Sequence, residues 1–553
     1  MSKNNIDDSK NWFQNIGLIL AGLFYLVACV IVFVNNSGGK LLAPSQKTIT
    51  FAHWNLEDGF REGYAEAIQR FEDYKAKQGQ KVKVIQTTVP FRGYPQWFLT
   101  QLIGGTPADV IKLSGSSEQH NQYFVPLSAY IGKPNPFNRG TPFESVPWKD
   151  TFLDNMNGGL NADYGEYYGI GINSATYRVY VNLDLLEKAT GSRKMPDTLT
   201  EWLTVCEKLK EYGEKIGKPI IPIGVRGFDK RTLNYLFYYY FSQMNSDLNE
   251  DMSGNCSPRA ENAKIFEALA GNRLSREKIL AAADIIKQIG QYFCKGFTAT
   301  DQEQTKFLFF AGNVGFFPEG TWNAYSMVKN SPFEVGIAEI PVIGDDHEYS
   351  KYFVGRPTEQ GLGVGGLFGI PKASKNFSMA LEFLQFTTSW KINQMIMADY
   401  CKWLPAVKKA EYKGILKYCQ PQLGSGQRMI CPPFYASIGT WRKMLESLET
   451  IIINNENEAG KIFWRDFIER IPLEIEEIED TITATRRTML SIEKQRSAIA
   501  VAGLVTDLQA EAEKRLENRY ELILESLISS YRNMACYRET ITILRKLRKK
   551  EGK

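Results

Sequence analysis

The chain has 553 residues, of which 43% are hydrophobic and 23% are charged, and its formal net charge is +4. This length exceeds what one compact core usually holds, so we expect two or more domains of ordinary soluble composition. A net charge this small gives no reason to expect a nucleic-acid partner, which would need a clustered basic face.

The residue types give little support to metal or cofactor chemistry. Of the three histidines, His53, His120 and His347, none stands at the paired spacing of a catalytic zinc site. The eight cysteines include no pair at CxxC spacing, which disfavours structural zinc and thioredoxin-like redox chemistry. We therefore expect no metal, no cofactor and no catalytic residue.

Residues 16–34 form an apolar segment that contains no charge. As a helix rising ~1.5 Å per residue it would span about 28 Å, close to the thickness of a bilayer core. Lys3 and Lys10 precede it and the next cation is Lys40, which favours an N-terminus inside and the rest outside. Two anchors fit the residues: an uncleaved helix, or a lipid on Cys29, which ends a Leu-Val-Ala-Cys run resembling a lipobox. Either one predicts an extracytoplasmic protein tethered to membrane lipid.

After residue 47, strand-like runs alternate with amphipathic helical runs. Strand, helix, strand, helix and strand are predicted over 48–52, 59–74, 82–85, 94–103 and 108–113. This alternation is typical of an open parallel α/β sheet. Ligands of such sheets lie beyond the carboxyl ends of the strands, so the loops 53–55 and 114–116 should face one cleft.

The middle of the chain is richer in helix. Apolar residues at three and four spacing predict helices over 198–212 and 275–293. The later runs predict, in order, a segment 305–310, a turn at Gly312, a segment 314–317, a glycine-rich strand 364–370 and a helix 379–386.

A series of short segments, in collinear order, resembles one known family. The segments are Ile49–Trp54, Gly105–Val110, Tyr168–Ile170, Tyr180–Leu186, Pro196–Trp202, Phe309–Phe316 with Glu319–Trp322, Gly369–Lys372 with Ala380–Phe386, and Trp403–Ala406. They resemble the family 1 extracellular solute-binding proteins, the maltose-binding-protein-like group that serves sugar-type ABC importers. The similarity runs from about residue 48 to 457, and it departs from the family pattern at Trp202, which is displaced by three positions.

The resemblance implies an α/β fold, a two-lobed periplasmic-binding-protein-like clamp of type II that closes on a small ligand. By the family pattern the binding domain covers 48–460, with lobe one at about 48–165 and 333–400 and lobe two at about 166–332 and 401–459. An anchor and linker over 1–47 would precede it. The implied partners are a carbohydrate or related small molecule and an ABC permease in the membrane.

Residues 461–553 extend beyond the family pattern and are helical and charged. Ile475, Ile478, Ile482, Met489 and Ile492 fall at heptad spacing. The pattern predicts two or three amphipathic helices, a coiled-coil-like extension packed against itself or against a partner.

Candidate ligand-binding residues follow from sugar chemistry. A sugar ring has apolar C–H faces and hydroxyls in its plane, so a binder needs flat aromatic rings and planar polar side chains. The stacking candidates are Trp54, Trp322, Trp403 and Trp441, each of which has a core role as its alternative. The polar candidates are Asn55, Asp58, Ser114, Asn173, Arg226 and Glu319. Asp58 precedes Gly59 at a helix start, so an N-cap role is an equal alternative for it.

The predicted function is capture of a small carbohydrate by lobe closure and its delivery to a permease. One alternative is a membrane-anchored sugar sensor that signals through the C-terminal helices, which a plain binding protein does not need. The other is a glycoside-active enzyme, which requires two carboxylates across a sugar bond. Glu57, Asp58 and Glu319 could serve, but no local motif supports them, so we predict a protein that is not an enzyme.

Overall fold

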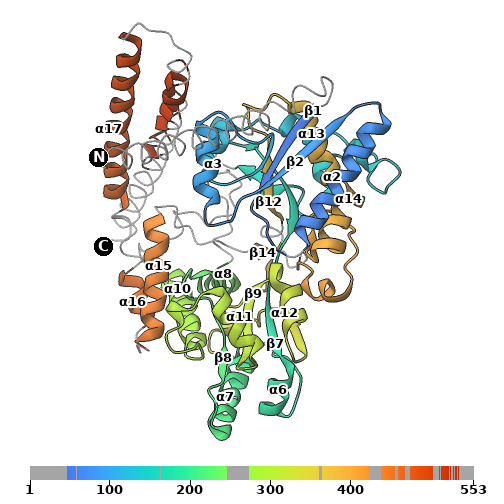
Figure 1. Ribbon diagram of the computed structural model, residues 1–553. Coiled ribbons are helices and arrows are strands. Elements are labelled where there is room, and N and C mark those ends of the chain that lie inside the picture. The colour runs from blue at the N-terminus through green and yellow to red at the C-terminus, as the bar shows by residue number, and fades with distance from the viewer. Residues whose placement is uncertain are drawn as a thin grey trace, which may run out of the picture. The chain divides into compact units, whose positions relative to one another are not determined.

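The computed structural model describes residues 47–57, 59–161, 164–245, 273–359, 364–422, 427–428, 438–454, 459–466 and 474–501, and part of 510–534 (Figure 1). The predicted membrane segment 16–34, with Cys29, and the candidate Asp58 lie outside the described residues. Within the described ranges, no helix combines the length and apolar character needed to cross a bilayer.

The first lobe is built on a mixed sheet. Its strands, in spatial order, are β13 (Leu404–Pro405), β6 (Ile170–Ser174), β12 (Val364–Gly369), β3 (Val110–Lys112), β1 (Lys47–His53) and β2 (Val82–Thr88). β1 and β3 are parallel, as the sequence predicts, and Phe51 lies opposite Val110. β12 and β13 return from later in the chain and run antiparallel to their neighbours, so the sheet as a whole is mixed rather than parallel.

Aromatic side chains cover both faces of this sheet. The helices of the lobe are α2 (Phe60–Lys77), α3 (Tyr94–Ile103), α4 (Ser117–Tyr123), α5 (Ser128–Ile131), α13 (Phe377–Thr387) and α14 (Trp390–Gln394). Phe98 of α3 packs with Ile111 in one buried cluster. On the other face, the ring of Phe51 lies 5.1 Å from that of Tyr64 in α2 and 5.4 Å from that of Phe383 in α13. Helices therefore sandwich the strands whose ends carry the candidate loops (Figure 1).

The chain forms two compact units, and β1, α2 and β2 each have residues in both. The smaller unit joins Ile68–Ile85 to the segment that ends at Ile49. Within it, Glu72 accepts a hydrogen bond from the backbone N–H of Val84 at 2.8 Å and pairs with Lys83 at 3.2 Å. These contacts hold the second half of α2 to the start of β2. All the features described below belong to the larger unit.

The second lobe has its own sheet. Its strands, in spatial order, are β10 (Val335–Ala338), β7 (Tyr177–Asn182), β9 (Val314–Gly320) and β8 (Ile221–Ile223). β7 is antiparallel to β9, with Tyr177 opposite Gly320, and β8 is parallel to β9. This register brings the start of β7 to the end of β9, where the sequence predicts Glu319 and Trp322 as ligand-binding residues.

Helices bury the core of the second lobe. They are α6 (Leu183–Thr190), α7 (Leu199–Ile216), α8 (Arg231–Met244), α10 (Arg273–Gly290), α11 (Gln302–Phe310), α12 (Ala324–Asn330), α15 (Ile438–Ile453) and α16 (Ala459–Asp466). α7 begins where the Thr198 side chain accepts a hydrogen bond from the backbone N–H of Glu201, and it ends at Gly217 in the left-handed conformation. Trp202 of this helix is fully buried.

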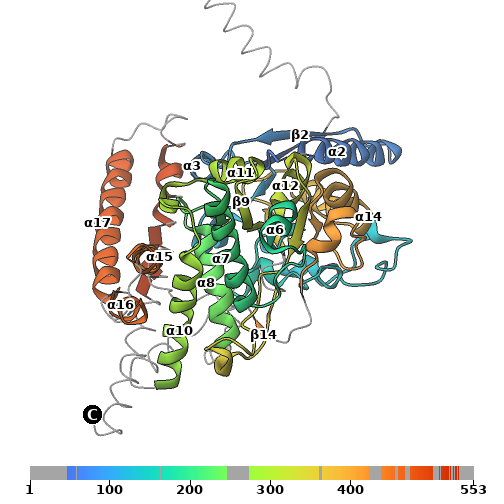
Figure 2. The same ribbon diagram turned by 90° about the horizontal axis from the view of Figure 1, so that it is seen from below.

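The last helices of lobe two correct a predicted boundary. Phe463 and Trp464 of α16 are 0% and 3% exposed and belong to the lobe-two core. Figure 2 shows α10, α15 and α16 side by side. The predicted start of the extension at 461 therefore falls inside a core helix. The prediction placed the boundary there because these two buried aromatics stand among charged residues in the sequence.

The crossing between the sheets also differs from the predicted lobe ranges. β6 and β13 belong to the first sheet, although the ranges 166–332 and 401–459 assign them to lobe two, and β10 belongs to the second sheet despite lying within 333–400. The first crossing is the Ala175-Thr176 link between β6 and β7. There, Thr176 and Thr321 exchange two hydrogen bonds, at 3.0 and 2.9 Å. In the sequence, the turn before β6 is easier to recognise than the short Ala175-Thr176 link at which the chain crosses between the sheets.

The C-terminal extension is helical where it is described. α17 (Glu474–Val501) lies along residues of the 510–534 segment, since Tyr520 donates a hydrogen bond to Glu493 at 3.0 Å and Arg496 pairs with Glu517 at 3.6 Å. Ile482 and Ile492 are buried, as their spacing suggests.

Candidate ligand-binding site

A buried ion pair joins the last residues of β9 to the loop after β8. Glu319 is 0% exposed, and its Oε2 accepts a hydrogen bond from Nη1 of Arg226 at 3.2 Å. Its Oε1 accepts from the backbone N–H of Gly320 at 2.7 Å. Arg226 also pairs with Asp229 in the loop after β8. Burial raises the pKa of Glu319, and the positive charge of Arg226 opposes that rise.

Three aromatic rings stand beside this ion pair. Tyr177 stacks on Tyr235 with ring centroids 3.7 Å apart and planes at 14°. The half-buried Trp322 meets Tyr177 edge-on at 5.5 Å. A Cβ at residue 320 would lie 2.2 Å from the indole of Trp322, so only Gly320 lets the ring fold back over the strand end. Trp322, Arg226, Glu319 and Tyr177 are called the lobe-two cluster below.

The lobe-two cluster and its neighbours contain polar atoms without a hydrogen-bond partner among the described residues. They are Oη of Tyr177, Nε of Arg226 and Nδ2 of Asn323. Buried polar atoms are nearly always hydrogen-bonded in native proteins. Several unpaired donors and acceptors beside one aromatic platform are the chemistry that a ligand with many hydroxyls would satisfy.

A second group of candidates gathers at the ends of β1, β3 and β6. Asn55 is 3% exposed and accepts a hydrogen bond from the Lys112 ammonium at 2.7 Å. The same ammonium lies 4.2 Å from the ring centroid of Trp54. Asn173 and Lys112 both border Gly366, since a Cβ there would meet Oδ1 of Asn173 at 2.4 Å and Cε of Lys112 at 3.6 Å. Trp54, Asn55, Lys112 and Asn173 are called the lobe-one cluster.

Burial dominates the electrostatics of the lobe-one cluster. It lowers the pKa of Lys112 to about 7, and the negative charge of Glu57 opposes this effect. Burial, with the nearby charge of Lys112, also lowers the pKa of His53 to about 3, so that imidazole is neutral. His53 accepts the backbone N–H of Asn55 on Nδ1 at 3.1 Å. The loop that carries Trp54 is thereby fixed to the end of β1.

The structure places the other predicted residues elsewhere. Trp403 is 9% exposed and meets the ring of Phe60 edge-on at 4.7 Å, inside lobe one. The backbone carbonyl of Ser114 contacts Nε2 of His120 at 2.9 Å, and its half-buried side chain joins neither cluster. The side chain of Trp441, like Asp58, lies outside the described residues.

Sequence reasoning missed Lys112, Tyr177 and Tyr235. Lys112 could have been identified from the sequence, because a lysine inside the apolar run Val110–Leu113 predicts a buried cation. The two tyrosines gave none, since their stacking depends on a contact between β7 and α8.

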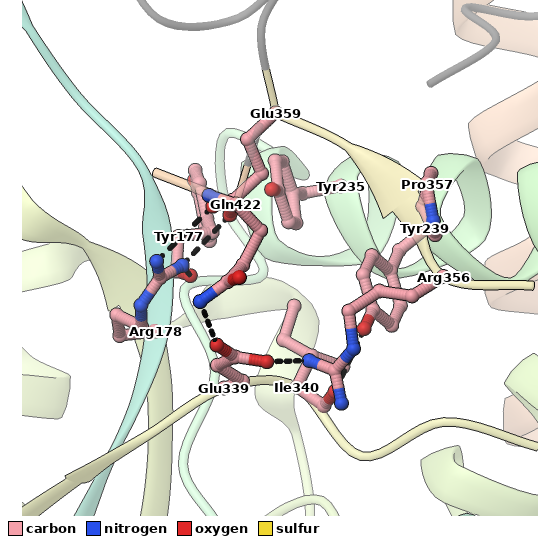
Figure 3. A pocket seen from close by; sticks show the side chains of 10 residues that line it. All are labelled: Tyr177, Arg178, Tyr235, Tyr239, Glu339, Ile340, Arg356, Pro357, Glu359 and Gln422. Atoms are coloured by element: carbon pink, nitrogen blue, oxygen red, sulfur yellow. Dashed lines mark hydrogen bonds and ion pairs between the residues drawn. The ribbon is translucent and has the colours of Figure 1, made fainter. Parts of the chain in front are cut away.

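The cavity of Figure 3 is too small for a sugar. It measures about 10 Å³, room for one water at most. Arg178 spans it and forms two hydrogen bonds with the carboxylate of Glu359, at 2.7 and 3.1 Å, while Glu339 contacts both Arg356 and Gln422 (Figure 3). The buried Arg178–Glu359 pair ties β7 to the segment around β11 (Pro357–Thr358), and the more exposed Arg356–Glu339 pair ties that segment to the residue after β10.

Comparison with known families identifies the kind of protein that carries these two clusters. Residues 54–393 match the family model described as bacterial extracellular solute-binding protein. The chain belongs to that family. This solute-binding protein is therefore a receptor rather than an enzyme, and it works outside the cytoplasm. The glycoside-active alternative is accordingly set aside. No curated protein sequence matches the chain.

Solved structures share the fold of this solute-binding protein at low identity. The GacH receptor of Streptomyces glaucescens, crystallised unliganded and with acarbose, is 16% identical with a TM-score of 0.52 over 76% of this chain and 96% of that one. A chitin oligosaccharide binding protein is 13% identical with a TM-score of 0.53 over 78% and 99%. The apo-form of RafE from Streptococcus pneumoniae is 16% identical with a TM-score of 0.51 over 76% and 97%.

Proposed function

We propose that this solute-binding protein captures a carbohydrate between its lobes and delivers it to an ABC permease. The observation that carries the proposal is the lobe-two cluster, where the half-buried ring of Trp322 meets Tyr177, and Oη of Tyr177 and Nε of Arg226 have no hydrogen-bond partner among the described residues. An aromatic face suits the C–H surface of a sugar, and the unpaired atoms suit its hydroxyls. The printed names of structures with the same fold, which include an acarbose complex and a chitin oligosaccharide binder, support this ligand class.

The ligand-contacting residues in this proposal come from both clusters. They are Trp54, Asn55, Asn173, Arg226, Glu319 and Trp322. Asn173 precedes the Ala175-Thr176 crossing by two residues and Tyr177 follows it directly. A small rotation about this link would move the clusters relative to each other, so a ligand that contacts both favours one closed arrangement.

The proposal includes a tether. Residues 16–34 are apolar and uncharged in the sequence, and a membrane anchor there would keep the clamp near its permease. A helix and a lipid on Cys29 are both compatible with this role.

A second candidate function, a sugar sensor, rests on the C-terminal extension. Nε2 of Gln122, in α4 of lobe one, donates a hydrogen bond to Glu521 of the extension at 3.4 Å. The extension follows α16, which packs in lobe two. A segment that contacts one lobe and continues from the other would report lobe movement to a membrane partner. Co-purification with a permease or with a kinase-like membrane protein separates the two functions.

A thermal-shift screen of the full chain against mono- and oligosaccharides tests the main proposal. A ligand held at 100 times its Kd adds about 2.7 kcal/mol to the free energy of unfolding. We expect at least one saccharide to raise the Tm and to be recovered unchanged. Small-angle scattering with that saccharide should show a smaller radius of gyration. Absence of any saccharide-dependent shift would count against carbohydrate binding.

A further inference from the structure

The lobe-one cluster contains a cation that is almost fully enclosed. Lys112 is 4% exposed, and among the described residues its ammonium has one hydrogen bond, to Oδ1 of Asn55 at 2.7 Å. The ring of Trp54 adds a cation–π contact at 4.2 Å. No carboxylate in the described part of the chain lies within ion-pair distance of this nitrogen. An ammonium carries three donors, so two are left for another acceptor.

The neighbouring groups compensate this charge poorly. The exposed Glu57 reaches it only through Asn55, whose Nδ2 donates to Oε2 of Glu57 at 3.3 Å. His53 is neutral and cannot balance a cation. Burying an ammonium among neutral groups is costly unless an anion completes the site.

The cation lies beside half-exposed backbone of β12. Gly365 and Gly366 of β12 are half-exposed beside it, and a Cβ at Gly366 would lie 3.6 Å from Cε of Lys112 and 2.4 Å from Oδ1 of Asn173. Glycine at 366 therefore lets the side chains of Lys112 and Asn173 lie against the half-exposed backbone, where any other residue would collide with Asn173. The carboxamide nitrogen of Asn173 borders the same backbone, since a Cβ at Gly365 would lie 3.8 Å from its Nδ2. Its amide is a second donor at the same place.

We propose that Lys112, with Asn173, selects acidic sugars, so that the preferred ligand carries a carboxylate such as that of a uronic acid. The inference rests on the proposed carbohydrate function and names its ligand class. A carboxylate matches this site because one negative charge and two oxygens meet one cation and its two unused donors. A dianionic sugar phosphate would leave surplus negative charge in a site that lacks the arginine fork or clustered cations typical of phosphate sites.

Isothermal titration of the full chain with matched sugar pairs tests this inference. The probes are galacturonate against galactose, glucuronate against glucose, and glucose 6-phosphate as a phosphate arm. A charge-assisted hydrogen bond should make one uronate bind about tenfold to a hundredfold more tightly than its neutral partner. Titration in buffers of different ionisation enthalpy should show proton uptake with the uronate only, because the carboxylate stabilises charged Lys112.

Two variants assign the preference to Lys112. Lys112→Met should abolish the preference for the uronate over its neutral partner, and Lys188→Met, at an exposed site on α6, should leave the preference unchanged. Equal or tighter binding of the neutral sugars by the wild-type chain would overturn the acidic-sugar inference and leave the carbohydrate function intact. Tighter binding of the phosphate would overturn the carboxylate class. Binding of no saccharide at all would overturn both.

Discussion

Arg226 donates a hydrogen bond to Glu319 at 3.2 Å, and the glutamate side chain is 0% exposed. Removing one partner of a buried ion pair leaves the other charge unpaired and costs about 3–5 kcal/mol. We therefore expect Arg226→Met to lower the free energy of unfolding by that amount, measured by urea denaturation. The double variant Arg226→Met/Glu319→Gln should recover most of the loss, because the amide can still accept from the backbone N–H of Gly320. A double variant no more stable than the single one would show that the pair is not the source of the cost.

Lys112 should give the unfolding free energy a distinctive pH dependence. Its pKa is lowered to about 7 in the folded chain from an ordinary 10.5, so between these values the unfolded chain binds a proton that the folded chain does not. Stability then rises with pH across this window, and the full burial penalty applies below about pH 7. Each pKa unit corresponds to about 1.4 kcal/mol.

Lys112→Met removes that titration. The variant should unfold at a higher urea concentration than wild type at pH 6.5, and this difference between the two proteins should be smaller at pH 9.5. The unpaired Oδ1 of Asn55 adds a constant cost of about 1–3 kcal/mol, so the change with pH is the diagnostic quantity. Lys188→Met is the control. An offset from wild type that is the same at both pH values would contradict a depressed pKa at Lys112.

Some of this site could be predicted from the sequence, and the reason lies in local chain geometry. Glu319, Gly320 and Trp322 are close in sequence, so their proximity follows from the strand end itself. Lys112 and Asn55 are 57 residues apart, and they meet only because β1 and β3 are adjacent and parallel. A contact between residues so far apart in the sequence cannot be recognised from a short motif.

The same distinction holds for the fold. The alternation of strand and helix predicted the elements of lobe one well, with β1 and β3 parallel as expected. The predicted strand 364–370 corresponds to β12, but its antiparallel pairing and the strand β13 were not predicted, since nothing local shows which sheet a returning strand joins. Phe463 and Trp464 lie in a charged stretch, and only their packing against lobe two identifies them as core residues.

Trp322 and Trp403 should respond differently to replacement by alanine. Trp322 is half-buried beside unpaired polar atoms, whereas Trp403 is 9% exposed and packs against Phe60. Trp322→Ala should weaken saccharide binding about tenfold to a hundredfold, with base stacking, worth about 1–3 kcal/mol, as the nearest analogue. Trp403→Ala should cost about 3–5 kcal/mol of stability, as core aromatics do, with little change in affinity at low temperature. Calorimetry and denaturation of both variants give the comparison, and a stability loss at Trp322 with unchanged affinity would place that ring in the core.

The end of lobe two can be located by truncation. Phe463 and Trp464 are 0% and 3% exposed, and the guanidinium of Arg276 lies 4.5 Å from the centroid of the Trp464 ring. A chain that ends at Asp466 keeps both aromatics, and a chain that ends at Asn454 loses both. Because truncating one buried aromatic costs about 3–5 kcal/mol, the shorter chain should unfold at much lower urea while the longer one stays close to full length.

A pair of point variants in the full chain separates the loss of packing from the loss of chain length. Phe463→Ala should reproduce much of the destabilisation seen in the shorter truncation. Leu490→Ala, at a side chain of α17 that is 57% exposed, should change the unfolding free energy by less than about 0.5 kcal/mol. If the two truncated chains prove equally stable and Phe463→Ala is neutral, α16 belongs to the extension and the boundary near 461 is correct after all. If the longer truncation alone keeps the stability of the full chain, the solute-binding fold needs the chain as far as α16 and the segment after it is free to serve a separate role.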